Sequence, residues 1–198
     1  MALLTPGTAA SQSSDILLNC TSCHSLSNTE APRYPVLNGQ PVNYLIEQLA
    51  AFRSGTRTHP QMRRTAIALG SEGAPAMSRM YADAPPPELA PQPREERFAD
   101  AIRLMTEGAW ERGIAPCASC HVLPGADEDG IETGAHDAPW IHGQPETYLA
   151  GTLRAFASGE RDTGGLRRMQ AYAERLTDNE IADLSAYLAA YATTEDEQ

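Results

Sequence analysis

The 198-residue chain contains no lysine, so all 15 of its basic side chains are arginines. Aspartate and glutamate total 26, and the formal net charge is therefore −11. Such a charge argues against nucleic acid or an anionic membrane surface as a partner. The chain also lacks any run of about 20 apolar residues, the length that a helix needs to span a bilayer. We therefore expect neither nucleic-acid binding nor a transmembrane segment.

The negative charge is confined to the second half of the chain. Residues 1–90 carry six arginines and six acidic side chains, for a net charge of zero. Residues 91–198 carry nine arginines and twenty acidic side chains, for a net charge of −11. Either this half is simply a solubilising surface, or the molecule has one neutral and one acidic end that orient it toward partners.

Cysteine is used only four times, in two copies of the pattern Cys-x-x-Cys-His at residues 20–24 and 117–121. In this pattern the two thiols can add to the two vinyl groups of one porphyrin, and the next histidine can ligate its iron. A zinc ribbon would place its cysteine pairs about 15–20 residues apart, and disulfides would need no histidine after each pair. The pattern predicts two covalent heme c groups, held by Cys20, Cys23, Cys117 and Cys120 with the iron ligands His24 and His121. Buried cofactors also suit an aromatic content of only 6%.

A long internal repeat accompanies the two cysteine motifs. Residues 35–41 match residues 139–145, and Tyr44 and Arg57 match Tyr148 and Arg161, all at an offset of 104. The two motifs themselves are offset by 97, so the second copy has seven extra residues, which lie in the acidic stretch 126–137. The repeat predicts a duplicated heme domain.

The domain boundaries follow from the repeat and from a proline-rich run. We expect a signal remnant or disordered start at 1–11, a first domain at 12–84 and a second at 94–192. Between them, residues 85–93 read as an extended and semi-rigid linker. The chain then ends in an acidic tail at 193–198.

Apolar periodicity predicts helices throughout and no strand. Leu45, Leu49 and Phe52 recur at helical spacing, as do their repeat counterparts, and Gly55 and Gly159 are placed to end these helices. Thr177 and Glu180 form a capping box before the final helix.

Two further helices are expected on either side of the linker. In the first half we expect a short last helix with Pro75 near its first position and with Met77, Met80 and Tyr81 facing inward. Residues 94–107 are expected to open the second domain as a helix. The predicted fold is all-α, with each half wrapped around one heme.

Methionine is the expected second ligand of each iron, because His/Met ligation is typical of electron carriers. Met169 is the only methionine after His121, and Met62 occupies the corresponding place in the first half. The alternatives left open are His59 in the first half and His136 or His142 in the second. Of these, His142 is expected at the surface or beside a ligand.

Other side chains are expected to support the cofactors. The carbonyls of Pro35 and Pro139 are candidates to accept the second ring N–H of each ligating histidine. Arg57 and Arg161 could pair with heme propionates, although an exposed arginine after a helix end is the competing interpretation.

The order of these motifs in both halves resembles the cytochrome c4 family, from Asp15 to Ala192. The resemblance implies two tandem class I cytochrome c domains related by a pseudo-twofold axis, in a periplasmic protein. It further implies that single electrons pass from a bc1-type complex or a dehydrogenase to a terminal oxidase, such as a cbb3-type oxidase, or to a reductase.

Two other functions compete with that of a free electron carrier. One is a diheme subunit of a larger oxidoreductase, such as flavocytochrome c sulfide dehydrogenase, which would bring a stable partner subunit. The other is a stand-alone heme enzyme, which would need an open iron or a cysteine ligand. A methionine in each half and the absence of a spare cysteine argue against the enzyme.

Overall fold

The computed structural model describes residues 20–24, 34–91, 96–122, 138–163 and 167–191. Within these ranges the chain is helical, and its only strand-like pairs are two isolated bridges. Residues 20–24 are helical. The α-helices that follow are α2 (Val42–Ser54), α3 (Pro60–Ala82), α4 (Ala99–Thr106), α5 (Glu146–Ala157), α6 (Arg168–Ala173) and α7 (Asp178–Ala189). Three short 3-10 helices, η1 (Glu96–Phe98), η2 (Trp110–Arg112) and η3 (Cys117–Ser119), complete the second half. None of the helices described is long and apolar enough to cross a membrane.

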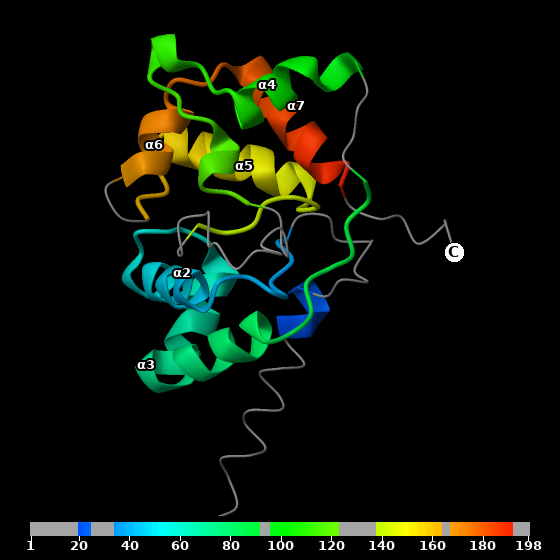
Figure 1. Ribbon diagram of the computed structural model, residues 1–198. Helices are drawn as coiled ribbons and strands as arrows, with labels where there is room; N and C mark the ends of the chain where they lie inside the picture. Colours follow the sequence, from blue (N-terminus) through cyan, green and yellow to red (C-terminus); the bar gives the residue numbers. More distant parts are fainter. Residues whose placement is uncertain (1–19, 25–33, 92–95, 123–137, 164–166, 192–198) are drawn as a thin grey trace, which may run out of the picture.

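The two halves form two helical layers that meet along their loops (Figure 1). In the described ranges α2 packs on α3, whereas α5 packs on both α6 and α7 and α4 packs on α7. No helix of one half packs against a helix of the other in those ranges. The all-α fold of two repeated units is therefore confirmed, and the surface between the units is built from loops and side chains.

The second half has a continuous apolar core between α4, α5 and α7. Leu104 and Leu184 are 1% and 3% exposed, and the ring of Phe98 meets that of Tyr187 edge to face at 5.6 Å. The opening helix expected at 94–107 is divided into η1 and α4, and its first two residues lie outside the described ranges.

The final helix begins at the capping box that the sequence predicts. The hydroxyl of Thr177 accepts from the backbone N–H of Glu180, whose carboxylate accepts from the backbone N–H of Thr177. Arg112 also forms a two-pronged ion pair with Glu180, with N–O distances of 2.6 and 2.9 Å. The Arg112 guanidinium and the capping bonds lower the pKa of the Glu180 carboxyl to about 2.

We expect Glu180→Gln to reduce the acid sensitivity of the fold. A carboxyl with a depressed folded-state pKa contributes stability above its unfolded pKa, and that contribution is lost as the pH falls from about 4.5 toward about 2. Glutamine keeps the capping acceptor but does not titrate. At pH 7 the variant should melt a few degrees below the parent, because it has lost the ion pair with Arg112. The difference should be no larger, since solvent screens this pair. Thermal melts across pH 2–7 should show this gap closing in acid; a constant gap would contradict the assignment.

Helix α3 bends at Gly70, which has φ 66° and ψ −170°. This bend corresponds to the break between α6 and α7, so the repeat extends through the last two helices of each half. The expectation for Pro75 was wrong, because the helix resumes directly after Gly70 and Pro75 lies inside it. Met80 was also misplaced: Ala74, Ser78 and Tyr81 occupy the inner face, and Met80 is 37% exposed.

The described part of the linker contacts both halves. At Pro86 it approaches Gly39 so closely that a Cβ on that glycine would lie 2.8 Å from the proline ring. At Ala90 its backbone N–H donates to the carbonyl of Tyr191 at 2.8 Å. Outside the described residues lie the expected N-terminal remnant 1–11, the acidic stretch 126–137, the end of the linker and the tail 193–198.

Candidate functional site

One cavity of about 890 Å³ extends through both halves of the molecule. Ligand pockets usually have volumes of about 300–1,000 Å³, so this cavity can hold large groups. It is lined by every site residue expected from the sequence: Cys20, Cys23, His24, Pro35, Arg57, Met62, Cys117, Cys120, His121, Pro139, Arg161 and Met169. The structure therefore brings both cysteine motifs, far apart in sequence, onto one continuous space.

The local backbone places both cysteines of each motif on the same cavity. Residues 20–24 are helical, so Cys20 and Cys23 are three residues apart on one face. In the second half, η3 carries Cys117, and Cys120 follows directly. All four thiols are free, and burial raises the pKa of Cys117 to about 11. Among the described residues no cluster of three or more His, Cys, Asp or Glu side chains could hold a metal ion.

Each motif histidine is held by a backbone carbonyl. The Nδ1 atom of His24 lies 2.7 Å from the carbonyl oxygen of Pro35, and that of His121 lies 2.7 Å from the carbonyl oxygen of Pro139. A carbonyl only accepts, so Nδ1 carries the proton and Nε2 keeps a free lone pair. Burial lowers the pKa of both imidazoles. The neutral ring with a fixed tautomer is the form that ligates a metal.

Met62 and Met169 are half-buried in the first turns of α3 and α6, and both line the cavity. His59 also lines it, but its Nδ1 accepts from the backbone N–H of Met62 and so caps α3. His142 is 4% exposed and packs against Tyr191. Of the two places expected for it, the surface is therefore wrong, whereas its electrostatic interaction with His121 fits a place beside a ligand. His136 lies outside the described residues.

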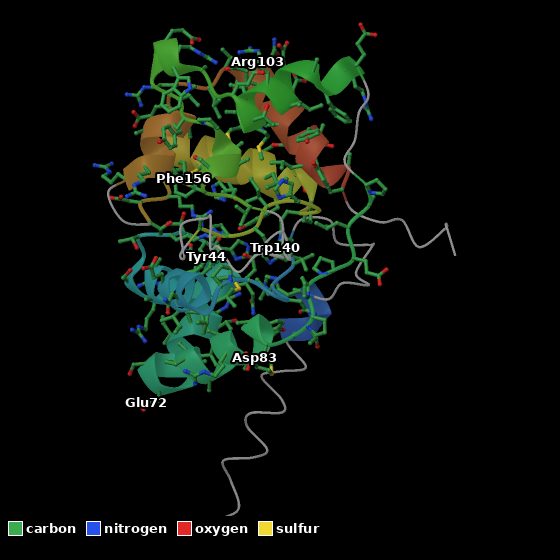
Figure 2. The ribbon with its side chains drawn as sticks, viewed as in Figure 1. Tyr44, Glu72, Asp83, Arg103, Trp140 and Phe156 are labelled. Atoms are coloured by element: carbon green, nitrogen blue, oxygen red, sulfur yellow. The ribbon has the colours of Figure 1, made fainter. Side chains whose placement is uncertain are left out.

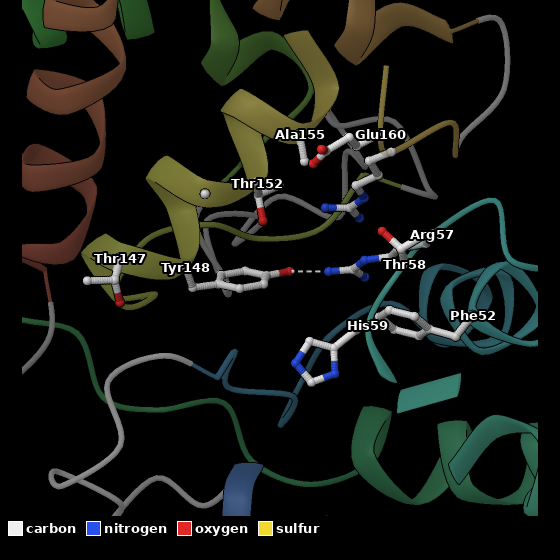
Figure 3. A pocket seen from close by; sticks show the side chains of 11 residues that line it. Phe52, Arg57, Thr58, His59, Thr147, Tyr148, Thr152, Ala155 and Glu160 are labelled. Carbon is white, nitrogen blue, oxygen red and sulfur yellow. Dashed lines mark hydrogen bonds between the residues drawn. The ribbon is translucent and has the colours of Figure 1, made fainter. Parts of the chain in front are cut away.

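The two arginines form the centre of a bridge between the halves. Arg57 donates to the hydroxyl of Tyr148 at 3.1 Å, and Arg161 donates to the hydroxyl of Tyr44 at 3.2 Å. These bonds are repeat counterparts of one another. Figure 3 shows the first of them beside a smaller cavity of about 270 Å³. Arg161 is only 5% exposed, so the interpretation of this residue as an exposed arginine is wrong.

The electrostatic character of this bridge is positive. Burial alone would raise the pKa of Tyr148, yet the guanidiniums of Arg57 and Arg161 outweigh burial and lower that pKa to about 7. In the described part of the chain neither arginine has a carboxylate within 4.0 Å. A buried charge is stable only when it is compensated, so this region suits negatively charged groups such as carboxylates.

A second reciprocal contact joins the halves, and the sequence did not reveal it. Gln40 donates to the carbonyl of Trp140 at 2.9 Å, and its counterpart Gln144 donates to the carbonyl of Val36 at 2.9 Å. Tyr44 and Trp140 lie between the two layers in Figure 2. The Gly-Gln repeat was the available signal, but the repetition of a glutamine does not indicate that its side chain binds the other half.

Four residues that line the cavity carry a buried polar atom with no hydrogen-bond partner in the described protein. The atoms are the Ser78 hydroxyl, the Tyr81 hydroxyl, the Trp140 indole nitrogen and Oε1 of Gln40. Buried polar groups are normally satisfied, and the first three can donate, so a group that carries acceptor oxygens is expected next to them. A porphyrin with carboxylate side chains fits this requirement, and the apolar side chains Leu45, Phe52, Leu149 and Phe156 supply its packing surface.

Known proteins similar to this chain are c-type cytochromes and an electron acceptor. The cytochrome c family profile matches residues 114–191. A protein of Thiomonas intermedia named "Thiosulfate dehydrogenase electron acceptor" is 32% identical over 87% of this chain and 78% of its own. Cytochrome c4 of Thiocapsa roseopersicina is 30% identical over 85% of each chain. The solved structure of Acidithiobacillus ferrooxidans cytochrome c4 is 26% identical, with a TM-score of 0.70 over 87% of this chain and 98% of that one.

These relatives match 85–87% of this chain, and they are electron carriers or electron acceptors and not catalysts. The cytochrome c family binds heme c covalently, and its c4 members carry two such groups. The chain therefore belongs to the cytochrome c4 family of diheme electron-transfer proteins.

Proposed function

We propose that this protein is a periplasmic carrier that takes single electrons from a dehydrogenase and delivers them to a terminal oxidase or reductase. The observation that carries the proposal is the shared cavity, which is lined by two cysteine pairs, two oriented histidines and two methionines. Each heme, when bound, supplies an iron that takes up and releases one electron.

The residues divide into two matching sets. Cys20 and Cys23 hold the first heme, with His24 and Met62 as iron ligands. Cys117 and Cys120 hold the second heme, with His121 and Met169 as iron ligands. Two protein ligands on each iron would leave no iron site open to a substrate, as a carrier requires.

The surrounding protein fixes these ligands and compensates charge. The carbonyls of Pro35 and Pro139 hold the histidine rings in one tautomer and one orientation. We assign Arg57 and Arg161 to the heme propionates, because the first is half-buried and the second buried, and neither has a carboxylate partner in the described residues. Guanidinium and carboxylate groups form strong paired hydrogen bonds.

For the electron donor we propose a thiosulfate dehydrogenase. The support is the likeness to the Thiomonas intermedia protein, which is named as the electron acceptor of that enzyme. A bc1-type complex is the competing donor and a cbb3-type oxidase is a candidate acceptor. A permanent partner subunit would appear as co-purification of a second chain.

We expect the oxidised protein to be reduced by catalytic amounts of a purified thiosulfate dehydrogenase and thiosulfate. Because residues 91–198 carry a net charge of −11, a basic docking face should attract this chain. The rate should then fall several-fold between low salt and about 0.15 M salt. Stopped-flow absorbance of the reduced heme bands measures both effects.

The control for this experiment is chemical reduction by dithionite. Reduction by dithionite but not by the enzyme would reject the donor and leave the carrier function intact. A protein whose hemes do not cycle reversibly between oxidised and reduced forms would contradict the carrier function itself.

A further inference from the structure

The contacts of the two bridging arginines follow the repeat only in part. The Arg57–Tyr148 and Arg161–Tyr44 contacts are counterparts, and both arginines lie over the phenylalanine ring of their own half at 4.4–4.5 Å. Gln48 departs from the repeat, because its counterpart at the same offset of 104 is Thr152.

Gln48 binds both arginines with one atom. Its Oε1 accepts from Nη1 of Arg57 at 2.9 Å and from Nη2 of Arg161 at 2.8 Å. Arg161 belongs to the second half, yet both Tyr44 and Gln48, which hold its Nη2, belong to α2 of the first half. In the described structure Thr152 makes no hydrogen bond to either guanidinium, although it also lines the cavity.

The charge distribution of the bridge is therefore unequal. Both guanidiniums converge on a side chain of the first half, which is itself 6% exposed, so solvent screens the two charges poorly. Positive charge near an iron favours its reduced form, which carries one positive charge less. Charge and hydrogen bonding around a heme are established means of setting its potential.

We propose that Gln48 is a positioning residue that makes the first heme site the one more easily reduced, by drawing both arginines toward α2. This inference rests on the proposed assignment of the two hemes to the two cysteine motifs. It gives the electron a preferred position in one of the two halves.

The repeat supplies a matched pair of test variants. Gln48→Thr gives both halves threonine, whereas Thr152→Gln gives both halves glutamine. In either variant the equilibrium constant for moving an electron from the second heme to the first should move toward one. The expected change is roughly three- to tenfold, the equivalent of one ordinary hydrogen bond. The exchanged variant, Gln48→Thr with Thr152→Gln, should reverse the preference.

Spectroelectrochemical titration of the holoprotein, with the hemes assigned by NMR, measures this equilibrium constant. The isosteric variant Gln48→Glu keeps the shape of the bridge and adds a negative charge, so it should lower the potential of the first heme selectively. Unchanged separation of the two potentials in Gln48→Thr, Thr152→Gln and Gln48→Glu would overturn the proposal.

The heme count and spin state of each variant separate this proposal from the function on which it rests. Two low-spin hemes with unaltered potentials would reject the role of Gln48 alone. Fewer than two hemes in the unmodified protein would reject the assignment of the heme sites instead. Urea unfolding of each variant shows that a shifted potential does not arise from loss of the fold.

Discussion

Replacing Cys117 and Cys120 together by alanine should leave one covalent heme per chain where the unmodified protein has two. All four cysteines line the cavity, and no cysteine lies outside the two motifs to substitute for a lost pair. The heme absorbance per mole of protein should therefore fall by about half. A pyridine hemochrome assay measures the number of hemes, and mass spectrometry of the denatured chain shows whether they are covalently bound.

The matched control is the double replacement of Cys20 and Cys23 in the first half. It should also halve the heme content, while the retained heme is the other one. Together the two variants test whether each motif acts on its own heme. Loss of both hemes from either variant, with the chain still folded, would show that the two sites do not bind independently.

Met169→Leu should convert the second iron from His/Met ligation to a site with an open position. Met169 lines the cavity from the first turn of α6, and leucine has similar bulk but no ligating sulfur. Loss of a methionine ligand should lower the potential of that heme by on the order of 100 mV or more. It should also halve the far-red charge-transfer band that methionine ligation produces, and allow carbon monoxide to bind to the reduced protein.

Met80→Leu serves as the control, since Met80 is 37% exposed and does not line the cavity. Met62→Leu is the corresponding change in the first half. If Met62→Leu leaves the band and the potential unaltered, then Met62 is not a ligand and His59, which lines the same cavity, takes its place.

The sequence was most informative where covalent or repeated chemistry fixes the spacing of residues. The Cys-x-x-Cys-His motifs, the offset of 104 and the capping box of Thr177 and Glu180 each predicted a feature of the architecture. The spacing within each cysteine motif and within the capping box is set by bonds among residues close in sequence. The offset of 104 is visible because the second half repeats the residues of the first. The resemblance to the cytochrome c4 family, drawn from their order, is confirmed by the relatives.

The sequence was least informative where the two halves meet. That Gln40, Gln144 and Arg161 reach into the opposite half depends on the relative placement of the two units, which no local pattern encodes. The errors at Pro75 and Met80 have a local cause. Gly70 restarts the helix at φ 66°, and this shift in phase turns Met80 outward.

The central claim is that both irons are held by one histidine and one methionine in a two-heme carrier. The most direct test is the visible spectrum of the oxidised and the reduced protein, combined with a hemochrome count. We expect two heme c groups per chain, both low-spin, with the methionine charge-transfer band and no binding of carbon monoxide. A high-spin signal, or carbon monoxide binding to one reduced heme, would reveal an open iron and would contradict the account in favour of a heme enzyme.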